Sequence, residues 1–212
     1  MFITFEGADG TGKSTQIARL AEGLRSRSRD VVVTREPGGT ALGETIRRIL
    51  LDSRTRGLAP RAEMAMMFAA RAQHITEIIR PNLAVGRIVL CDRFTDSTEA
   101  YQGFGRGLGS EIVLEMHRLV CENLQPNATV LLMFDDAQHS LKRAAARNAE
   151  ATEDESRFED EGVGFQLRVT DGYRAIAARE PQRVKVVDAA GAIEDVHKRV
   201  VKALRGILNC GD

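Results

Sequence analysis

The chain of 212 residues is poor in the features that mark membrane-bound and secreted proteins. No apolar run approaches the roughly 20 residues that a membrane-crossing helix needs, so we expect no membrane partner. The first residues read as a strand, and we expect no signal peptide. The cysteines, Cys91, Cys121 and Cys210, are odd in number and widely spaced, which fits neither a disulfide framework nor a zinc site. These absences favour a cytoplasmic protein.

An excess of charge is also lacking. The formal net charge is zero, which argues against non-specific nucleic-acid binding. Lysine accounts for only 5 of the 30 basic residues. The abundant arginine side chains suit bidentate phosphate binding, although a general bias toward arginine explains the composition equally well.

Short apolar runs alternate with longer helical patterns along the whole chain, as in a parallel sheet with helices on both faces. We expect strands near 2–6, 30–34, 87–91, 128–134 and 183–188. Helices are expected near 13–28, 40–51, 61–80, 110–124, 137–147, 163–179 and 192–208. No repeat or low-complexity linker divides the chain, so the sequence predicts one α/β domain over 1–212.

The most informative segment is a glycine-rich loop between the first strand and the first helix. It has the spacing of a phosphate-binding P-loop, in which glycines let backbone N–H groups surround a polyphosphate. The dipole of the following helix favours an anion. The expected nucleotide-binding residues are Gly7, Ala8, Asp9, Gly10, Thr11, Gly12, Lys13, Ser14 and Thr15. Lys13 would reach the β- and γ-phosphates, and the Ser14 hydroxyl would ligate Mg²⁺. The alternative is a glycine-rich turn of structural use only.

Polar residues follow the second and third strands, where a doubly wound sheet forms its ligand crevice. Arg35 and Glu36 precede a tight turn that contains Pro37, and that turn could be purely structural. At the end of the third strand, Asp92 is placed to hold Mg²⁺ or its water shell, and Arg93 could bind a second phosphate.

An arginine, Arg71, lies within an apolar helical stripe that includes Met64 and Phe68. Burying an unpaired guanidinium is costly, so this side chain needs an anion or an aromatic face. Either an internal salt bridge or a flat, carbonyl-bearing ligand stacked on Phe68 would satisfy it.

An acidic stretch over 148–164 contains few apolar residues and is expected to be a mobile loop. Arg143 and Arg147 lie four residues apart just before it. They could close over transferring phosphates as part of a lid at about 143–164, or they could be solvated surface charges.

Together these segments resemble the bacterial thymidylate kinases, members of the P-loop nucleoside monophosphate kinases. The resemblance extends from residue 2 to about residue 160. Its most specific parts are the turn Thr-Arg-Glu-Pro-Gly-Gly-Thr over 34–40 and the later Asp-Arg-Phe and Ala-Tyr-Gln segments. Further matching segments are the P-loop, Phe-Ala-Ala-Arg over 68–71 and Ser97-Thr98.

The resemblance implies a three-layer P-loop kinase fold with a five-stranded parallel sheet and a mobile lid. The implied reaction transfers the γ-phosphoryl group of ATP, with Mg²⁺, to dTMP, giving dTDP and ADP. Asp9 would lie near the sugar and the acceptor phosphate, Arg93 would bind that phosphate, and Arg47 would reach the phosphate or the base. Recognition of the base and sugar would come from Arg71, Phe68, Ser97, Thr98, Tyr101 and Gln102, with Tyr101 crowding the 2′ position.

Two departures from the family pattern affect these assignments. Phe68 lies three residues before Arg71 where many members have it four before, so Met67 is an alternative stacking residue. Gly10 stands where one branch of the family has an arginine, and the other branch takes its catalytic arginines from the lid. This favours Arg143 and Arg147, with Arg157 as the leading lid donor.

The family forms homodimers, and an apolar helical stripe offers either an interface or a core-facing surface: Ile112, Val113, Met116, Leu119 and Val120. The closest rival function is a kinase for another nucleoside monophosphate or a deoxynucleoside. A GTPase-like switch is disfavoured because the sequence has no Asn-Lys-x-Asp motif.

Overall fold

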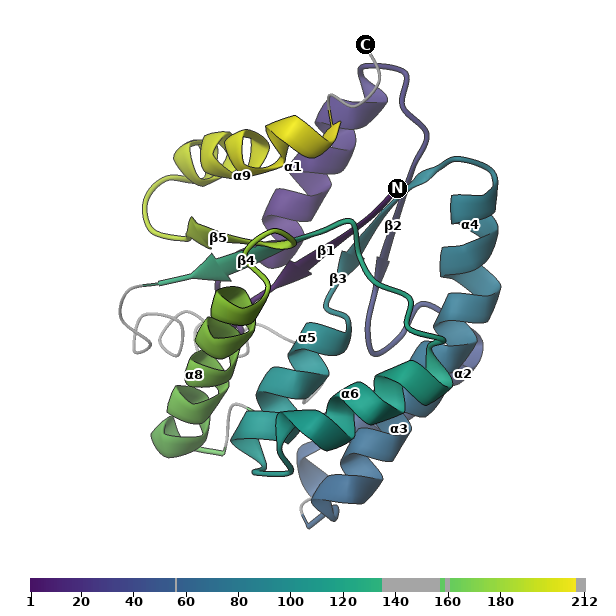
Figure 1. Ribbon diagram of the computed structural model, residues 1–212, viewed down its shortest axis with the longest axis vertical. Helices are drawn as coiled ribbons and strands as arrows, with labels where there is room; N and C mark the ends of the chain where they lie inside the picture. The colour runs from purple at the N-terminus through teal and green to yellow at the C-terminus, as the bar shows by residue number, and fades with distance from the viewer. Residues whose placement is uncertain (56, 135–156, 159–160, 209–212) are drawn as a thin grey trace.

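The computed structural model describes residues 1–55, 57–134, 157–158 and 161–208 (Figure 1). In this part of the chain, five parallel strands form one sheet in the order β2-β3-β1-β4-β5. Their bounds are β1 Phe2–Glu6, β2 Val31–Arg35, β3 Ile88–Asp92, β4 Ala128–Met133 and β5 Val184–Asp188. Each agrees with a predicted strand to within a residue or two. The α/β fold class with a five-stranded parallel sheet is confirmed.

Two helices cover one face of the sheet, α1 (Lys13–Arg25) and α9 (Ile193–Leu208) (Figure 1). Apolar residues recur at helical spacing on both, and their buried members pack on β-strand residues such as Phe5 and Val130. Burial of these stripes makes the first half of the core.

The other face carries α3 (Pro60–His74), a π-helical turn (Ile75–Ile79), α4 (Arg80–Ala84), α6 (Ser110–Val120) and α8 (Val163–Arg179). The short helix α5 (Thr95–Thr98) and a π-helical segment (Glu99–Gly105) lie between α6 and α8. Outside them, α2 (Ala41–Leu51) packs on α3, and a short 3₁₀ turn (Ser53–Thr55) follows α2. Figure 1 shows the resulting three layers.

Three predicted helices end at other residues in the structure, and one helical segment was not predicted. The helix expected over 13–28 ends at Arg25, and Ser28 has a left-handed φ of 58°. The helix expected over 110–124 ends at Val120, shortly before two more left-handed residues. The helix expected over 61–80 runs on through its π-helical turn to Ala84. The run Thr95–Gly105 is helical although no helix was predicted there, and the helix expected over 137–147 lies outside the described residues.

The sheet order brings the carboxyl ends of three strands together. Residue Phe5 of β1 and Arg35 of β2 both pair with Asp92 of β3. The P-loop, Asp92 and the β2 turn therefore meet at one edge of the sheet, where a doubly wound fold binds its ligands. Within the described residues, no helix is both long enough and apolar enough to cross a membrane.

Candidate active site

The P-loop directly follows β1, and its first glycine packs closely against β4. Gly7 has φ +129°, and a Cβ at this position would lie 2.2 Å from the carbonyl oxygen of Leu132. Any other residue would therefore displace β4 or the loop. The buried Lys13 donates from Nζ to the carbonyl oxygens of Gly7 and Ala8, at 3.1 and 2.9 Å. Burial, followed by repulsion from Arg93, lowers the pKa of Lys13 to about 8. The ammonium thus lies over the loop, where two backbone carbonyl oxygens of the loop hold it.

The two predicted metal ligands lie side by side. Ser14 Oγ donates to Asp92 Oδ2 at 2.9 Å. The other carboxylate oxygen, Asp92 Oδ1, is buried and has no hydrogen-bond partner within the described part of the chain. A hydroxyl beside a carboxylate with an unused oxygen is a donor set that suits Mg²⁺ and its water shell.

A second group of predicted site residues lies beside the P-loop, around Arg93. The Arg93 guanidinium pairs with Asp9 at 2.8 Å and lies over the ring of Tyr101, 5.0 Å from its centroid. The Tyr101 hydroxyl accepts from Arg93 Nη2 and donates to Asp9 Oδ2, both at 3.3 Å. Burial raises the pKa of Tyr101, so the phenol stays protonated and acts as a donor. Three residues predicted from different segments are therefore in mutual contact.

Arg71 combines the two interpretations that the sequence left open. Its Nε donates to Glu36 Oε2 at 2.6 Å, which is the internal salt bridge. Its Nη2 donates to the carbonyl oxygen of Phe94 and to Thr98 Oγ1. The guanidinium lies between two rings, with its carbon 4.9 Å from the Phe68 centroid and 5.1 Å from that of Phe94. Its Nη1 is buried and has no hydrogen-bond partner among the described residues, so one donor of the guanidinium is left unused.

Glu36 fixes the position of the Arg71 guanidinium through their ion pair. Burial acts to raise the pKa of Glu36, but the Arg71 charge and the hydrogen bond from His74 together lower it, which keeps the carboxylate ionised. His74 Nδ1 lies 2.8 Å from Glu36 Oε1, and its Nε2 lies 2.6 Å from Thr34 Oγ1. Sequence reasoning missed His74, although a polar residue one helical turn after Arg71 is a usable signal.

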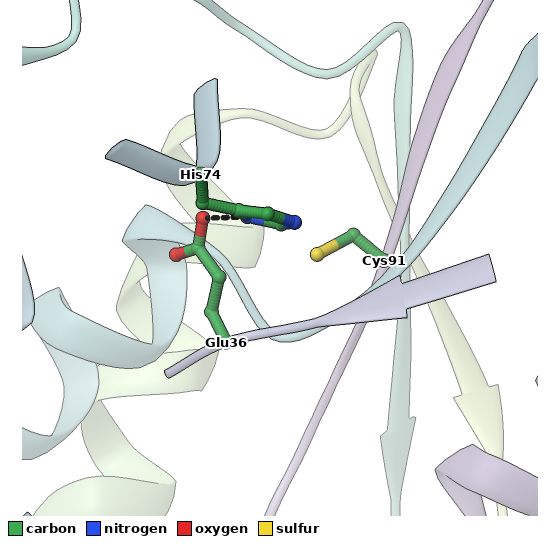
Figure 2. Close-up of side chains that lie close together, drawn as sticks. All are labelled: Glu36, His74 and Cys91. Carbon is green, nitrogen blue, oxygen red and sulfur yellow. Dashed lines mark hydrogen bonds and ion pairs between the residues drawn. The ribbon is translucent and has the colours of Figure 1, made fainter. Parts of the chain in front are cut away.

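Glu36, His74 and Cys91 form a compact cluster whose potential ligand atoms lie within 4.8 Å of one another (Figure 2). The Cys91 thiol already contacts the carbonyl oxygen of Arg93 at 3.1 Å, and burial raises its pKa well above the usual value. A thiol that stays protonated is a poor metal ligand. Glu36 and His74 are also hydrogen-bonded already. The cluster therefore has a structural role: Glu36 holds the Arg71 side chain, and Cys91 contacts the backbone at Arg93.

Other predicted binding residues have protein partners. Ser97 and Thr98 are buried behind Arg93 and Arg71, respectively. Gln102 donates to the buried Glu63 at 2.8 Å. Arg35 pairs with Glu44 at the surface, and Arg47 donates to the Pro37 carbonyl oxygen at 3.2 Å.

The arginines expected in the lid divide into two groups. Arg143 and Arg147 lie outside the described residues. Arg157 is only 4% exposed, donates to the Leu50 carbonyl oxygen at 2.9 Å and forms an ion pair with Glu63. Its role as a phosphate ligand stays a prediction, and that role requires the ion pair with Glu63 to open. Glu63 itself was missed, because an acidic residue in the first turn of a helix is ordinary.

The fold and the site together are those of a P-loop phosphotransferase. The P-loop follows the central strand of a parallel sheet, an acidic residue ends the neighbouring strand, and Arg93 lies beside both. Comparison with known proteins narrows this class. Residues 5–200 match the family model for thymidylate kinase. The chain belongs to the thymidylate kinase family, which confirms the resemblance drawn from the sequence.

The chain is similar to a thymidylate kinase of Desulfovibrio desulfuricans, with 49% identity over 98% of this chain and 96% of the relative. It is 50% identical to a thymidylate kinase of Solidesulfovibrio magneticus, over 94% of this chain and 96% of the relative. Among solved structures, a thymidylate kinase from Ehrlichia chaffeensis superposes with a TM-score of 0.75 at 36% identity, covering 97% of this chain and 98% of that one. Both sequence and fold thus place the chain in one family over nearly its full length.

Proposed function

We propose that this chain transfers the γ-phosphoryl group of ATP to dTMP, giving dTDP and ADP, with Mg²⁺ as the resident cation. The observation that carries the proposal is the unpartnered Nη1 of Arg71, a buried donor held between Phe68 and Phe94 near the P-loop edge of the sheet. A donor fixed in the plane of a guanidinium matches a base carbonyl, and the family's acceptor base is thymine.

The donor nucleotide is assigned to the P-loop. Backbone N–H groups over 7–12 and the dipole of α1 would bind the β- and γ-phosphates of ATP. Lys13 would neutralise charge on the transferring group. Ser14 and Asp92 would hold Mg²⁺, which when bound supplies further positive charge to the phosphates. Arg143, Arg147 and Arg157 would contribute from the lid.

The acceptor is assigned to the Arg93 side. Arg93 would bind the acceptor phosphate, and Asp9 and Tyr101 would hold the guanidinium and contact the sugar. Because the attacking oxygen already belongs to an anionic phosphate, positioning and charge neutralisation carry most of the catalysis. No strong general base is needed.

A panel of acceptors tests the proposal by coupled detection of ADP. With ATP and Mg²⁺, dTMP should give the highest kcat/KM, ahead of dUMP, dCMP, AMP and ribothymidine monophosphate. Thymidine should give only the acceptor-free background, because it has no phosphate for Arg93 to bind. Preference for thymidine, or for AMP, would overturn the assignment. A nucleotide switch would show no ADP burst on addition of dTMP.

We also propose a cytoplasmic homodimer. The two described cysteines, Cys91 and Cys121, are free thiols, consistent with a reducing compartment. Of the stripe on α6, Val113 is fully buried in the core while Leu119 is 60% exposed, so only part of it is available to a partner. Light scattering of the wild type and of a Leu119→Arg variant tests the interface: a dimer mass that the variant shifts toward the monomer supports it.

A further inference from the structure

A buried carboxylate, Glu6, lies behind the acceptor-phosphate arginine and has no part in the mechanism so far. It is the last residue of β1, directly before the P-loop, and is fully buried. Its Oε1 accepts from the backbone N–H of Phe94 at 2.7 Å. Its Oε2 accepts from Ser97 Oγ at 2.5 Å and from Tyr173 Oη at 3.1 Å. The three donors come from the loop after β3, from α5 and from α8.

The same two hydroxyl oxygens receive hydrogen bonds from Arg93. Its Nη1 donates to Ser97 Oγ at 2.9 Å and to Tyr173 Oη at 3.2 Å. A hydroxyl has one proton to give and lone pairs to accept with. The two hydroxyl oxygens also lie 2.9 Å from each other, so an ionised Glu6 competes with this contact for their protons. When both protons point to an ionised Glu6, both oxygens present lone pairs to the guanidinium. A neutral partner that donates would instead turn a hydroxyl proton toward Arg93, whose N–H groups cannot accept it.

We propose that Glu6 is the positioning residue for Arg93: the ionised carboxylate orients the Ser97 and Tyr173 hydroxyls and fixes the backbone at Phe94, so that the guanidinium faces the acceptor phosphate. The inference rests on the proposed role of Arg93 in binding that phosphate.

The backbone at Arg93 shows why a firm anchor is needed here. Arg93 has φ 69°, a left-handed conformation that non-glycine residues adopt only when their surroundings enforce it. The N–H of Arg93 donates to the Phe5 carbonyl oxygen at 2.9 Å, and the next N–H, of Phe94, donates to Glu6. Two consecutive N–H groups are thus tied to consecutive residues of β1. Glu6 therefore holds the backbone directly after the strained residue, and through Ser97 and Tyr173 it also orients the Arg93 side chain.

The environment lets Glu6 change charge near neutral pH. Burial, assisted by repulsion from Asp96 and opposed by attraction to Arg93, raises the pKa of Glu6 to about 7. The ionisable and polar groups that face it come from every neighbouring element: Lys13 on α1, Arg71 on α3, Cys91 on β3, Arg93 after β3, Asp96 and Ser97 on α5, and Tyr173 on α8. Protonation removes the acceptor that sets the direction of both hydroxyls.

The variant Glu6→Gln tests the hydrogen-bond chain from Glu6 through Ser97 and Tyr173 to Arg93. Glutamine has nearly the same size as glutamate, but its amide nitrogen donates a hydrogen bond where the carboxylate oxygen accepted one. The dissociation constant of dTMP should rise at least about tenfold, the effect of weakening one charge-assisted hydrogen bond. The KM for ATP should stay within about twofold, because the hydrogen bonds that the Glu6 carboxylate makes in the described part of the chain go to Phe94, Ser97 and Tyr173 and not to the P-loop. Calorimetric binding of dTMP, steady-state KM values and a melting curve give the comparison.

A pH profile separates positioning from a merely structural role. The ratio of wild-type to Glu6→Gln kcat/KM for dTMP cancels the ionisation of dTMP itself, which is common to both proteins. Since the ionised form of Glu6 is the competent one, the ratio should be largest above pH 8 and should fall as pH drops through 7 toward 6. A ratio that is constant across this range overturns the inference.

Two further variants serve as controls, one for the loss of a buried carboxylate and one for a Glu6→Gln variant that fails to fold. Glu99→Gln removes another buried carboxylate, paired with Arg179 at 2.6 Å, and should lower the melting temperature without changing dTMP affinity or the pH profile. If Glu6→Gln fails to fold, Tyr173→Phe removes one hydroxyl of the hydrogen-bond chain and should weaken dTMP binding about threefold or more, with ATP unaffected. Equal losses for both substrates, or none for dTMP, refute the role of Glu6. Inactivity of the wild type toward dTMP would instead refute the proposed function.

Discussion

Replacing Arg71 by lysine should separate the two interactions of its guanidinium. The salt bridge to Glu36 involves Nε, whereas the donor free for a ligand is Nη1. An ammonium can keep the charge pair with Glu36, but it cannot also occupy the Nη1 position or lie flat between Phe68 and Phe94. The lysine variant should therefore stay folded and lose acceptor recognition.

The magnitudes for lysine and alanine differ for a structural reason. Losing one hydrogen bond from a charged donor to the base costs about 1.5–3 kcal/mol, or roughly 10- to 150-fold in dTMP affinity. Arg71→Ala additionally removes the cation that balances the buried Glu36 carboxylate and leaves it only the hydrogen bond with His74, which costs about 3–5 kcal/mol of stability. For a chain of this size, that corresponds to a melting temperature lower by about 6–20 °C.

The assay measures dTMP and ATP affinity by calorimetry, together with melting curves, for the wild type, Arg71→Lys and Arg71→Ala. Arg71→Lys should melt close to the wild type, bind ATP normally and bind dTMP at least about tenfold more weakly. A lysine variant that binds dTMP within threefold of the wild type while melting much earlier would show that Arg71 is only a core ion-pair partner.

Three further predictions concern the phosphates, the sugar and the metal. Lys13→Ala should fold, by circular dichroism, and lose at least about a hundredfold in kcat; near-normal turnover would remove the P-loop argument. Tyr101→Phe should keep the preference for deoxy over ribo acceptors because the ring excludes the 2′-hydroxyl, whereas Tyr101→Ala should lose most of a discrimination of about a hundredfold; an unchanged kcat/KM ratio in the alanine variant contradicts this role. Asp92→Asn should raise the Mg²⁺ concentration for half-maximal activity at least about tenfold in a metal titration, and an unchanged midpoint would place the metal elsewhere.

The strands and most helices could be predicted because their apolar residues keep a clear period and glycines mark their ends. The segment Thr95–Gly105 could not, because its helix depends on packing against α8. A Cβ on Gly105 would lie 2.7 Å from the Phe165 ring, and one on Gly172 would lie 2.9 Å from Phe104. These glycines, which lower helix propensity, are what allows the two elements to approach so closely.

The placement of candidate site residues could be predicted where they stand at a strand end, as for Asp92 and Arg93, or within a motif of the family, as for Arg71. Residues that support the site could not be predicted, because they are far apart in the sequence and meet only in the folded chain. Glu6 and Tyr173 are 167 positions apart and touch only after α8 folds over the sheet. No local pattern distinguishes such residues from an ordinary strand-end acid or a core tyrosine.

Arg71 pairs with Glu36 and is also the proposed donor to the base, and this combination limits how base specificity can change. One guanidinium pairs with the buried Glu36 and, in the proposed function, would also offer the donor for the base. A substitution that changes recognition by removing the positive charge at position 71 should therefore also lower stability, whereas lysine keeps the charge. An enzyme engineered for a different base with a neutral residue at position 71 would need a compensating change at Glu36 in the same step, for example to glutamine. Positions 36 and 71 should accordingly vary as a pair, and double substitutions should recover stability that either single substitution loses.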